Sequence, residues 1–444
     1  MTSYYKKSTC STILISLVCL LSSCAVFKNK YNRDLINKSI LGSELFASHF
    51  TGFTLYDPVA DEYIYSINGD KYFTPASNTK LFTFYSALKL MNDSVPALKY
   101  IISGDSLIFW GTGDPTFLHP DFPDQPVFEF LKTSDRKLFY ATGNFQDKPF
   151  GSGWAWDDYE FYFQPERSAF PMYGNVISFT YDSIQDQEVV TPGLFRDYVE
   201  IDPPGIPTNY PRRHQRYNIF SYQLDSSKSA YKNRVPFQTS YELVKLLLED
   251  TLKKTVGIIP YKAIDQGKTV YSRPKKAVLS RMLKSSDNFL AEQLLYSCAA
   301  NFTDTLNSAS IRNYILKDHL SAFNQKPIWR DGSGLSRYNL FTPKSLVQLL
   351  KLIHQSIPES DIPHYFPIGG VDGTLKSWYL SDSDEPYIYA KTGTLSNNHS
   401  LSGFIRTKSN KLLIFSFMHN NYGTSSIPVR LEMEKTLRII RDRF

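Results

Sequence analysis

Ser77 and Lys80 form a Ser-x-x-Lys pattern that could supply a nucleophile and its base. The pattern follows a strand expected at 62–67 and opens a helix, where free N–H groups and the positive end of the helix dipole favour a developing anion. Positions i and i+3 share a helix face, so the Lys80 amine can reach the Ser77 hydroxyl and, when partly desolvated, accept its proton. On spacing alone, a helix-capping serine with a solvated lysine is the commoner explanation. The same spacing recurs at Ser3, Ser86, Ser134, Ser229 and Ser272.

Two further short motifs lie later in the chain. Ser286-Asp287-Asn288 stands at the entry of an amphipathic helix expected at 289–295, although such residues are also ordinary helix N-caps. Lys391-Thr392-Gly393 is the only Lys-[Ser/Thr]-Gly in the chain. It precedes an expected C-terminal hairpin, where a strand edge can offer an ammonium, a hydroxyl and a free N–H to a carboxylate. Its alternative interpretation is a solvated turn.

Strands at both ends of the chain frame these motifs, which predicts an α/β sandwich whose N- and C-terminal strands share one sheet. The predicted strands are 52–56, 62–67, 400–406 and 411–419. A first helix is predicted to begin near Thr74, and further helices are predicted at 240–252, 277–299, 343–354 and 429–440. Residues 93–237 carry short strands, aromatic clusters and Pro/Gly breaks, so we predict a β-rich insertion there. The sandwich domain is then formed by 46–92 and 238–444.

The composition is that of a globular protein of two or three domains, with 444 residues of which 42% are hydrophobic and 21% charged. The net charge of +6 is spread along the chain rather than gathered into a stripe, which argues against nucleic acid as a partner. The eight histidines are scattered, and no His-Glu-x-x-His or His-x-x-Glu-His run occurs. The sequence therefore predicts no metal site and no cofactor.

The N-terminus reads as an export signal. Two lysines precede an apolar run at 13–21 that has the length of a signal-peptide core. The run ends in Leu-Ser-Ser-Cys24, which resembles a bacterial lipobox, so residues 1–23 are predicted to be removed and Cys24 to carry lipid. The alternative is a cysteine that merely follows a simple signal peptide. We expect 24–45 to be a polar tether, and the protein to be anchored in a Gram-negative outer membrane facing the periplasm.

In this order, the three motifs resemble the set found in class A β-lactamases and penicillin-binding proteins. The long separation of Ser77 from Ser286 is similar to that in the class C low-molecular-mass penicillin-binding proteins, the D-alanyl-D-alanine carboxypeptidase/endopeptidase family. Further segments that resemble the family are 103–107, 111–116, 153–159, 331–337 and 370–375. The resemblance covers about 50–440 and is weakest at 191–234.

The resemblance implies a serine β-lactamase/transpeptidase-like fold, an antiparallel sheet flanked by helices, with the β-rich insertion between the first two motifs. It also implies that Ser77, deprotonated by Lys80, attacks the penultimate D-Ala carbonyl. The resulting acyl-enzyme is then hydrolysed by water. The oxyanion is expected against the backbone N–H groups of Ser77 and Thr394.

The other motif residues receive roles from the same resemblance. Ser286 would pass a proton to the leaving amine, and Asn288 would hold a substrate amide. Lys391, Thr392 and Gly393 would bind the terminal carboxylate of the peptide.

A second site follows by analogy with the family. Asp158 would bind an ammonium and Arg337 a carboxylate, with Ser396 nearby, which suits the zwitterionic end of meso-diaminopimelate. The alternative for these residues is surface salt bridging. The implied partners are peptidoglycan stem peptides and β-lactam antibiotics, with the balance of carboxypeptidase and endopeptidase activity left open. The competing functions are a β-lactamase or esterase on the same scaffold, and a non-catalytic binding protein of the cell envelope.

Overall fold

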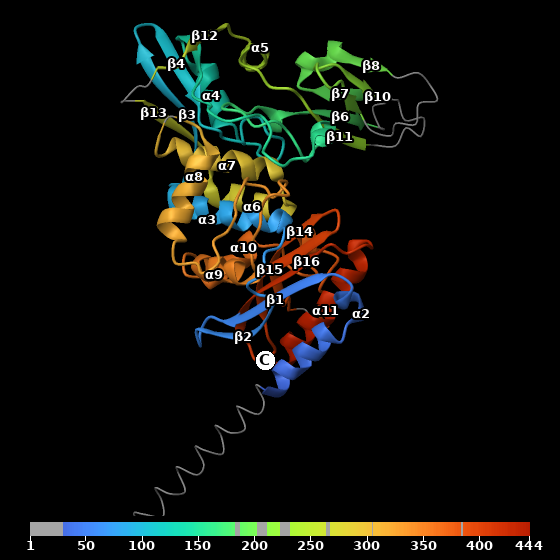
Figure 1. The fold of residues 1–444 in the computed structure, drawn as a ribbon. Helices are drawn as coiled ribbons and strands as arrows, with labels where there is room; N and C mark the ends of the chain where they lie inside the picture. Colours follow the sequence, from blue (N-terminus) through green and yellow to red (C-terminus); the bar gives the residue numbers. More distant parts are fainter. Residues whose placement is uncertain are drawn as a thin grey trace, which may run out of the picture.

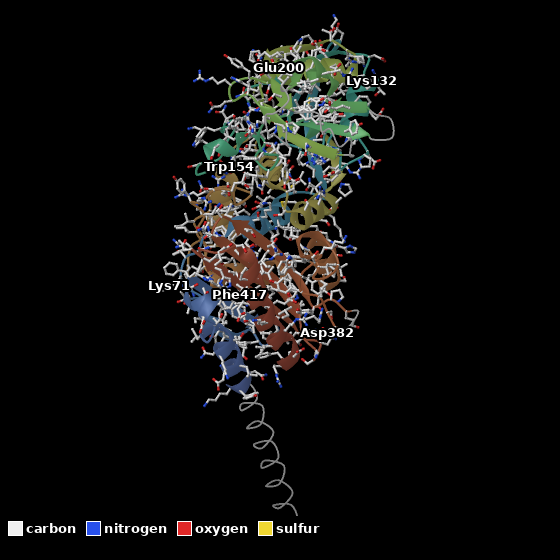
Figure 2. All side chains as sticks on the ribbon, turned by 90° about the vertical axis from the view of Figure 1, so that its right-hand side faces the viewer. Lys71, Lys132, Trp154, Glu200, Asp382 and Phe417 are labelled. Carbon is white, nitrogen blue, oxygen red and sulfur yellow. The ribbon has the colours of Figure 1, made fainter. Side chains whose placement is uncertain are left out.

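The computed structural model describes residues 30–182, 187–201, 211–222, 231–262, 267–303, 305–382 and 385–444. Its described part forms a lower body of sheet and helices and an upper, strand-rich body (Figure 1). Trp154 lies at the level where the two bodies meet, whereas Phe417 lies inside the lower body and Glu200 in the upper body (Figure 2). No helix of these residues is both long and apolar enough to cross a membrane.

The lower body is built on a five-stranded antiparallel sheet with the order β14-β15-β16-β1-β2. Phe53 lies opposite Phe417, so the first and last strands of the chain pair in its middle. This confirms the predicted sandwich closed by N- and C-terminal strands. The bounds are β1 (Phe50–Asp57), β2 (Glu62–Ile67), β14 (Ile388–Leu395), β15 (Asn398–Arg406) and β16 (Leu412–Asn420).

One face of this sheet is covered by α11 (Ser426–Arg443), the short helix α2 (Glu44–Ala47) and helical residues 30–41. Ile36 and Ile40 are buried in the core of this layer. The predicted tether was therefore wrong from residue 30 onward, because a stripe of apolar side chains spaced by one helical turn packs this segment onto the domain. Residues 24–29, with Cys24, lie outside the described residues.

The opposite face carries a layer of helices that separates the sheet from the upper body (Figure 1). Its centre is α7, whose residues are buried from Phe289 to Ala300, as expected for a helix enclosed on all sides. The helices of this layer are α3 (Lys80–Leu90), α6 (Lys275–Ser285), α7 (Asn288–Ala300), α8 (Ser308–Tyr314), α9 (Pro343–His354) and α10 (Ile362–Tyr365).

The upper body contains a second five-stranded sheet, ordered β12-β5-β4-β3-β13, and two three-stranded sheets, β11-β6-β7 and β8-β10-β9. Its strands are β3 (Ser94–Ser103), β4 (Ser106–Gly111), β5 (Lys137–Thr142), β6 (Val176–Asp182), β7 (Gln187–Thr191), β8 (Val199–Ile201), β9 (Arg212–Arg213), β10 (Phe220–Tyr222), β11 (Tyr231–Pro236), β12 (Val256–Pro260) and β13 (Lys268–Pro274), and its helices are α4 (Pro126–Thr133) and α5 (Tyr241–Leu252).

A strand-rich segment between the first two motifs was predicted, and the strands lie there. The sheet, however, extends past the expected boundary at residue 237. β12 pairs with β5 and β13 with β3, so strands from 256–274 complete a sheet begun by the insertion. A boundary drawn from composition cannot detect such long-range pairing.

Candidate active site

Ser77 lies in a short 3-10 turn, η1 (Ala76–Thr79), that leads into α3. It therefore precedes the α-helix rather than lying in its first turn. The residue before it, Ala76, has φ +48°, a left-handed conformation that costs an alanine energy and fixes the turn. Two backbone segments close in on this turn. A Cβ atom added to Gly393 would lie 2.5 Å from the carbonyl oxygen of Pro75. A Cβ atom added to Gly334 would lie 1.9 Å from the carbonyl oxygen of Ala76, so both positions need glycine.

Lys80 is fully buried and reaches back to the serine. Its Nζ donates to Ser77 Oγ at 3.0 Å, to Asn288 Oδ1 at 2.6 Å and to the Ser333 carbonyl oxygen at 2.7 Å. Burial lowers the pKa of Lys80 to about 8, against the opposing effect of nearby carboxylates, first that of Asp287. The predicted contact between nucleophile and base is thus present in the structure.

Ser286 is the residue at which α6 ends, in a left-handed conformation with φ +59°, and α7 begins after it. The helix expected over 277–299 is therefore two helices. Asp287 caps the second of them, accepting from the backbone N–H of Leu290 at 2.9 Å. This break turns the Ser286 hydroxyl toward Lys391, whose Nζ donates to Ser286 Oγ at 2.9 Å.

Asn288 links Lys80 to the upper body. While its Oδ1 accepts from Lys80, its Nδ2 donates to the carbonyl oxygen of Phe163 at 2.9 Å. Both ends of the amide are thus fixed, so the orientation of Asn288 is set by its partners.

Lys391 lies on β14, at the edge of the sheet, and is also fully buried. Burial, and then the positive charge of Lys80, lowers its pKa well below the ordinary value. The Nδ2 of Asn78 donates to the Lys391 carbonyl oxygen at 3.0 Å, which fastens the serine turn to the strand. Two lysines and two serines therefore lie close together around the serine turn.

The remaining residues of the third motif line the same strand edge. The Thr392 hydroxyl donates to Thr374 Oγ1 at 2.8 Å, and Thr374 lies in a segment already noted in the sequence. A Cβ on Gly393 would lie 2.9 Å from Ser77 N, so only glycine lets the strand backbone come so near the nucleophile. Thr394 follows with an exposed side chain whose hydroxyl lies 2.8 Å from His399 Nδ1.

Sequence reasoning missed the groups that hold Lys80 in place. The Ser333 backbone N–H donates to Glu292 Oε1 at 2.7 Å, and Glu292 Oε2 lies 3.3 Å from Arg167 Nη1. Both charged side chains are buried, and burial raises the pKa of Glu292. The carboxylate and guanidinium lie far apart in the sequence, so no local pattern could have paired them.

Asp331 organises the loop that supplies the Ser333 carbonyl oxygen. Its carboxylate is wholly buried and accepts from two backbone and three side-chain donors. These are Gly334 N at 2.9 Å, Ser336 N at 2.7 Å, Asn339 Nδ2 at 2.7 Å, Trp154 Nε1 at 2.8 Å and Ser333 Oγ at 3.4 Å. The sequence did mark 331–337 as a recognisable segment. The sequence did not indicate that the Asp331 carboxylate holds the loop together through hydrogen bonds.

Ser396 of the second site directly follows β14 (Ile388–Leu395), and Arg337 and Asp158 come from two other segments. Arg337 is exposed, and its Nη1 donates to the Ser396 carbonyl oxygen at 3.5 Å. Asp158 lies in η2 (Trp156–Glu160), where burial and then the charge of Asp157 raise its pKa and Arg337 opposes the shift. The acid and the base are therefore within electrostatic reach of each other.

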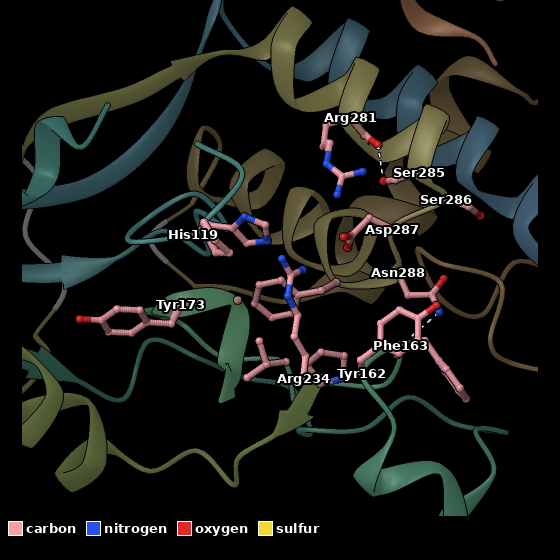
Figure 3. Close-up of a pocket in the computed structure, with 15 residues that line it drawn as sticks. His119, Tyr162, Phe163, Tyr173, Arg234, Arg281, Ser285, Ser286, Asp287 and Asn288 are labelled. Carbon is pink, nitrogen blue, oxygen red and sulfur yellow. Dashed lines mark hydrogen bonds between the residues drawn. The ribbon is translucent and has the colours of Figure 1, made fainter. Parts of the chain in front are cut away.

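A cavity of about 150 Å³ opens beside the second motif, lined by Ser286, Asp287 and Asn288 on one side. Tyr162 and Arg234 of the upper body lie on its other side (Figure 3). Within the described ranges, no group of three or more His, Cys, Asp or Glu side chains could hold a metal ion. Cys298 is buried, and burial raises the pKa of its thiol, so it is not a reactive group.

Comparison with known proteins gives a consistent picture. The chain is 25% identical to the D-alanyl-D-alanine carboxypeptidase DacB of Haemophilus influenzae over 99% of this chain and 98% of that protein. It is also 25% identical to the D-alanyl-D-alanine carboxypeptidase of Actinomadura sp. strain R39, over 84% of this chain and 78% of that one. The crystal structure of penicillin binding protein 4 from Haemophilus influenzae shares the fold, with a TM-score of 0.70 at 21% identity, covering 92% of this chain and 98% of that chain.

A family match covers residues 36–199 and 241–439, and so includes the serine turn, the second motif and β14. The matched ranges also include Asn78, Glu292 and Asp331, which hold the cleft together. The residues that meet around Ser77 are thus drawn from both matched stretches, and the chain belongs to the D-Ala-D-Ala carboxypeptidase 3 (S13) family.

Proposed function

We propose that this protein is a serine DD-peptidase that cleaves peptidoglycan peptides ending in D-Ala-D-Ala, or D-Ala cross-links, through an acyl-enzyme, and that it binds penicillins. The observation that carries the proposal is the 3.0 Å contact between Nζ of the buried Lys80 and Oγ of the partly buried Ser77. The family and its carboxypeptidase members support the reaction class. A related structure holds a β-lactam.

Ser77 and Lys80 carry out the first step. Neutral Lys80 takes the hydroxyl proton as Ser77 Oγ bonds to the carbonyl carbon of the penultimate D-Ala. With a pKa of about 8, roughly a tenth of Lys80 is neutral at pH 7, enough to act as a base without a histidine. The tetrahedral oxyanion forms against the N–H groups of Ser77 and Thr394.

Ser286 and Lys391 serve the departing amine. As the C–N bond breaks, Ser286 gives its proton to the leaving nitrogen, and the proton that Lys80 took from Ser77 replaces it. Lys391 Nζ, 2.9 Å from Ser286 Oγ, holds that hydroxyl in place. Asn288 holds the amide of the donor peptide, and Thr392 and Gly393 take the terminal carboxylate at the strand edge. Water then hydrolyses the ester on Ser77, which restores the free enzyme.

Labelling with a fluorescent penicillin, followed by digestion of purified muropeptides, tests this function. A stable label together with release of D-Ala or of uncross-linked peptide is the expected result. Absence of label and of digestion would favour a non-catalytic binding protein of the envelope. A label lost within seconds would instead favour a β-lactamase.

We further propose that Asp158, Arg337 and Ser396 select the zwitterionic side-chain end of diaminopimelate. Arg337→Ala should then slow cleavage of a diaminopimelate-containing peptide by about 10- to 150-fold in kcat/KM, corresponding to about 1.5 to 3 kcal/mol. Cleavage of a diacyl-Lys-D-Ala-D-Ala peptide should change little. Arg330→Ala, which removes an exposed arginine at the start of the same loop, is the matched control. Equal slowing of both peptides would mean that Arg337 supports the cleft rather than reading the substrate.

Cys24 is proposed to anchor the mature chain in the outer membrane, facing the periplasm. Support comes from the sequence alone, since the short apolar run ends in a lipobox-like segment and no acidic residue follows directly after Cys24. The several acyl chains of a lipoprotein bind a bilayer firmly, whereas a single chain binds marginally.

Cys24→Ser should therefore release the protein from the membrane fraction without altering its activity on soluble peptides. Cys19→Ser, a change in the apolar run upstream, should leave the protein in the outer-membrane fraction of a density gradient. A Cys24→Ser protein that still sediments with membranes would point to a different anchor.

A further inference from the structure

An open groove of about 680 Å³ lies in the upper body, formed between the η2 segment and strands β9 and β11. We propose that this groove binds the peptidoglycan polymer itself, an amino-sugar strand with carboxylate-bearing stem peptides, next to the peptide bond being cleaved. The proposal rests on the proposed peptidase function. The residues that line the groove include Glu160, Phe161, Tyr162, Arg212, Lys232 and Arg234.

The charge of the lining favours an acidic ligand. Arg212 and Lys232 are exposed, and within the described part of the chain neither has an ion-pair partner. Arg234 lies 3.7 Å from Asp121, but that carboxylate is already engaged by Arg281 at 2.5 Å. Arg212 and Lys232 thus line the groove beside the paired Arg234, and Glu160 is the one acid in its lining. Carboxylates along a stem peptide would find complementary charge there.

Exposed aromatic rings provide the surface for the sugar. Tyr162 is 66% exposed and Phe161 48% exposed, and these neighbouring residues both line the groove. Phe161 stacks on Phe163 with ring centres 5.5 Å apart and planes 8° apart, which holds its ring in place. A preformed flat ring binds the apolar face of a sugar with little loss of side-chain entropy.

The groove adjoins the cavity beside Ser286. Tyr162 and Arg234 line both the groove and the cavity beside Ser286, and Figure 3 shows both side chains on the upper-body side of that cavity. The Phe163 carbonyl oxygen accepts from Asn288, so the aromatic segment is fixed directly to a motif residue. A polymer lying in the groove would therefore lead its peptide into the cavity beside Ser286, where Asn288 contacts Lys80.

The proposal is tested by measuring how much protein sediments with purified peptidoglycan sacculi. The Ser77→Ala variant is used so that the sacculi are not cleaved during the measurement. In that background Arg212→Glu/Lys232→Glu should weaken co-sedimentation on the order of tenfold, and added salt should diminish the difference. Tyr162→Ser should weaken binding at low and high salt alike, because ring contacts are not screened. The control is Lys71→Glu/Lys326→Glu, which makes the same charge change at exposed lysines of the lower body and should bind as the parent protein does.

In the active protein, the ratio of sacculus cleavage to short-peptide cleavage should fall about tenfold in the groove variant and stay constant in the control. Undiminished sacculus binding by the groove variant would overturn the proposal. Equal competition by polygalacturonate, an acidic polysaccharide without peptides, would also overturn it, since the groove would then be a general anion site. Failure of the wild type to cleave short peptides would refute the peptidase function but leave the binding result readable.

Discussion

Ser77→Ala is expected to abolish peptide hydrolysis and covalent labelling by penicillin, with a loss of at least about 10⁴-fold in kcat. Among the residues that the structure describes, no other hydroxyl accepts from Lys80, and Ser286 is bonded to Lys391 instead. The Ser77 side chain is only partly buried, so its removal should leave the fold intact. Acylation is measured by gel fluorescence and hydrolysis by D-Ala release.

Ser134→Ala provides a control with the same Ser-x-x-Lys spacing. Ser134 lies in the upper body before β5, and its partner Lys137 is 72% exposed and paired with Asp105. This variant should label and hydrolyse as the wild type does. If Ser77→Ala were labelled at the wild-type rate, the nucleophile would have to be another residue.

Lys80→Met should lower kcat/KM by about 10²- to 10⁴-fold, because it removes the general base and keeps the apolar part of the side chain. The wild-type pH profile carries the same information. Since the neutral amine is the active form and its pKa is about 8, kcat/KM should fall as the pH drops below 8 and level off above it. Stopped-flow acylation over pH 5.5 to 9.5 measures both effects.

Lys137→Met is the matched control, since it removes the lysine of the Ser-x-x-Lys pattern that begins at Ser134. It should keep the wild-type rate and pH profile. A Lys80→Met enzyme that retained an inflection near pH 8 would show that a different group accepts the proton from Ser77.

Local sequence signals predicted several elements well. The strand at 62–67 and the helix at 343–354 have the predicted bounds, and Thr342 caps that helix with Pro343 in its first position. The helix over 277–299 was predicted as one because apolar periodicity continues through both halves. The left-handed Ser286 that divides it depends on tertiary contacts of the motif, which periodicity does not reveal.

Residues 24–45 were predicted to be a tether because they are mostly polar, yet Ile36 and Ile40 form a buried helix face. Polar residues outnumber apolar ones there, and only the spacing of the few apolar side chains indicates packing.

The same limit applies to the active site. The residues of the three motifs meet around Lys80 and Lys391, and their chemical roles are those proposed above. Glu292, Asp331 and Asn78 were not predicted, since their task is to hold other residues through contacts between distant segments. Their types are common in proteins, and their spacing follows no local period.

Peptide-mapping mass spectrometry of the wild-type protein after brief exposure to penicillin tests most directly the claim that Ser77 is the acylated nucleophile. We predict one adduct with the full mass of the intact antibiotic, on the proteolytic fragment that contains Ser77 and not on that containing Ser286. An adduct on any other residue, or peptide hydrolysis without an adduct at Ser77, would contradict the mechanism.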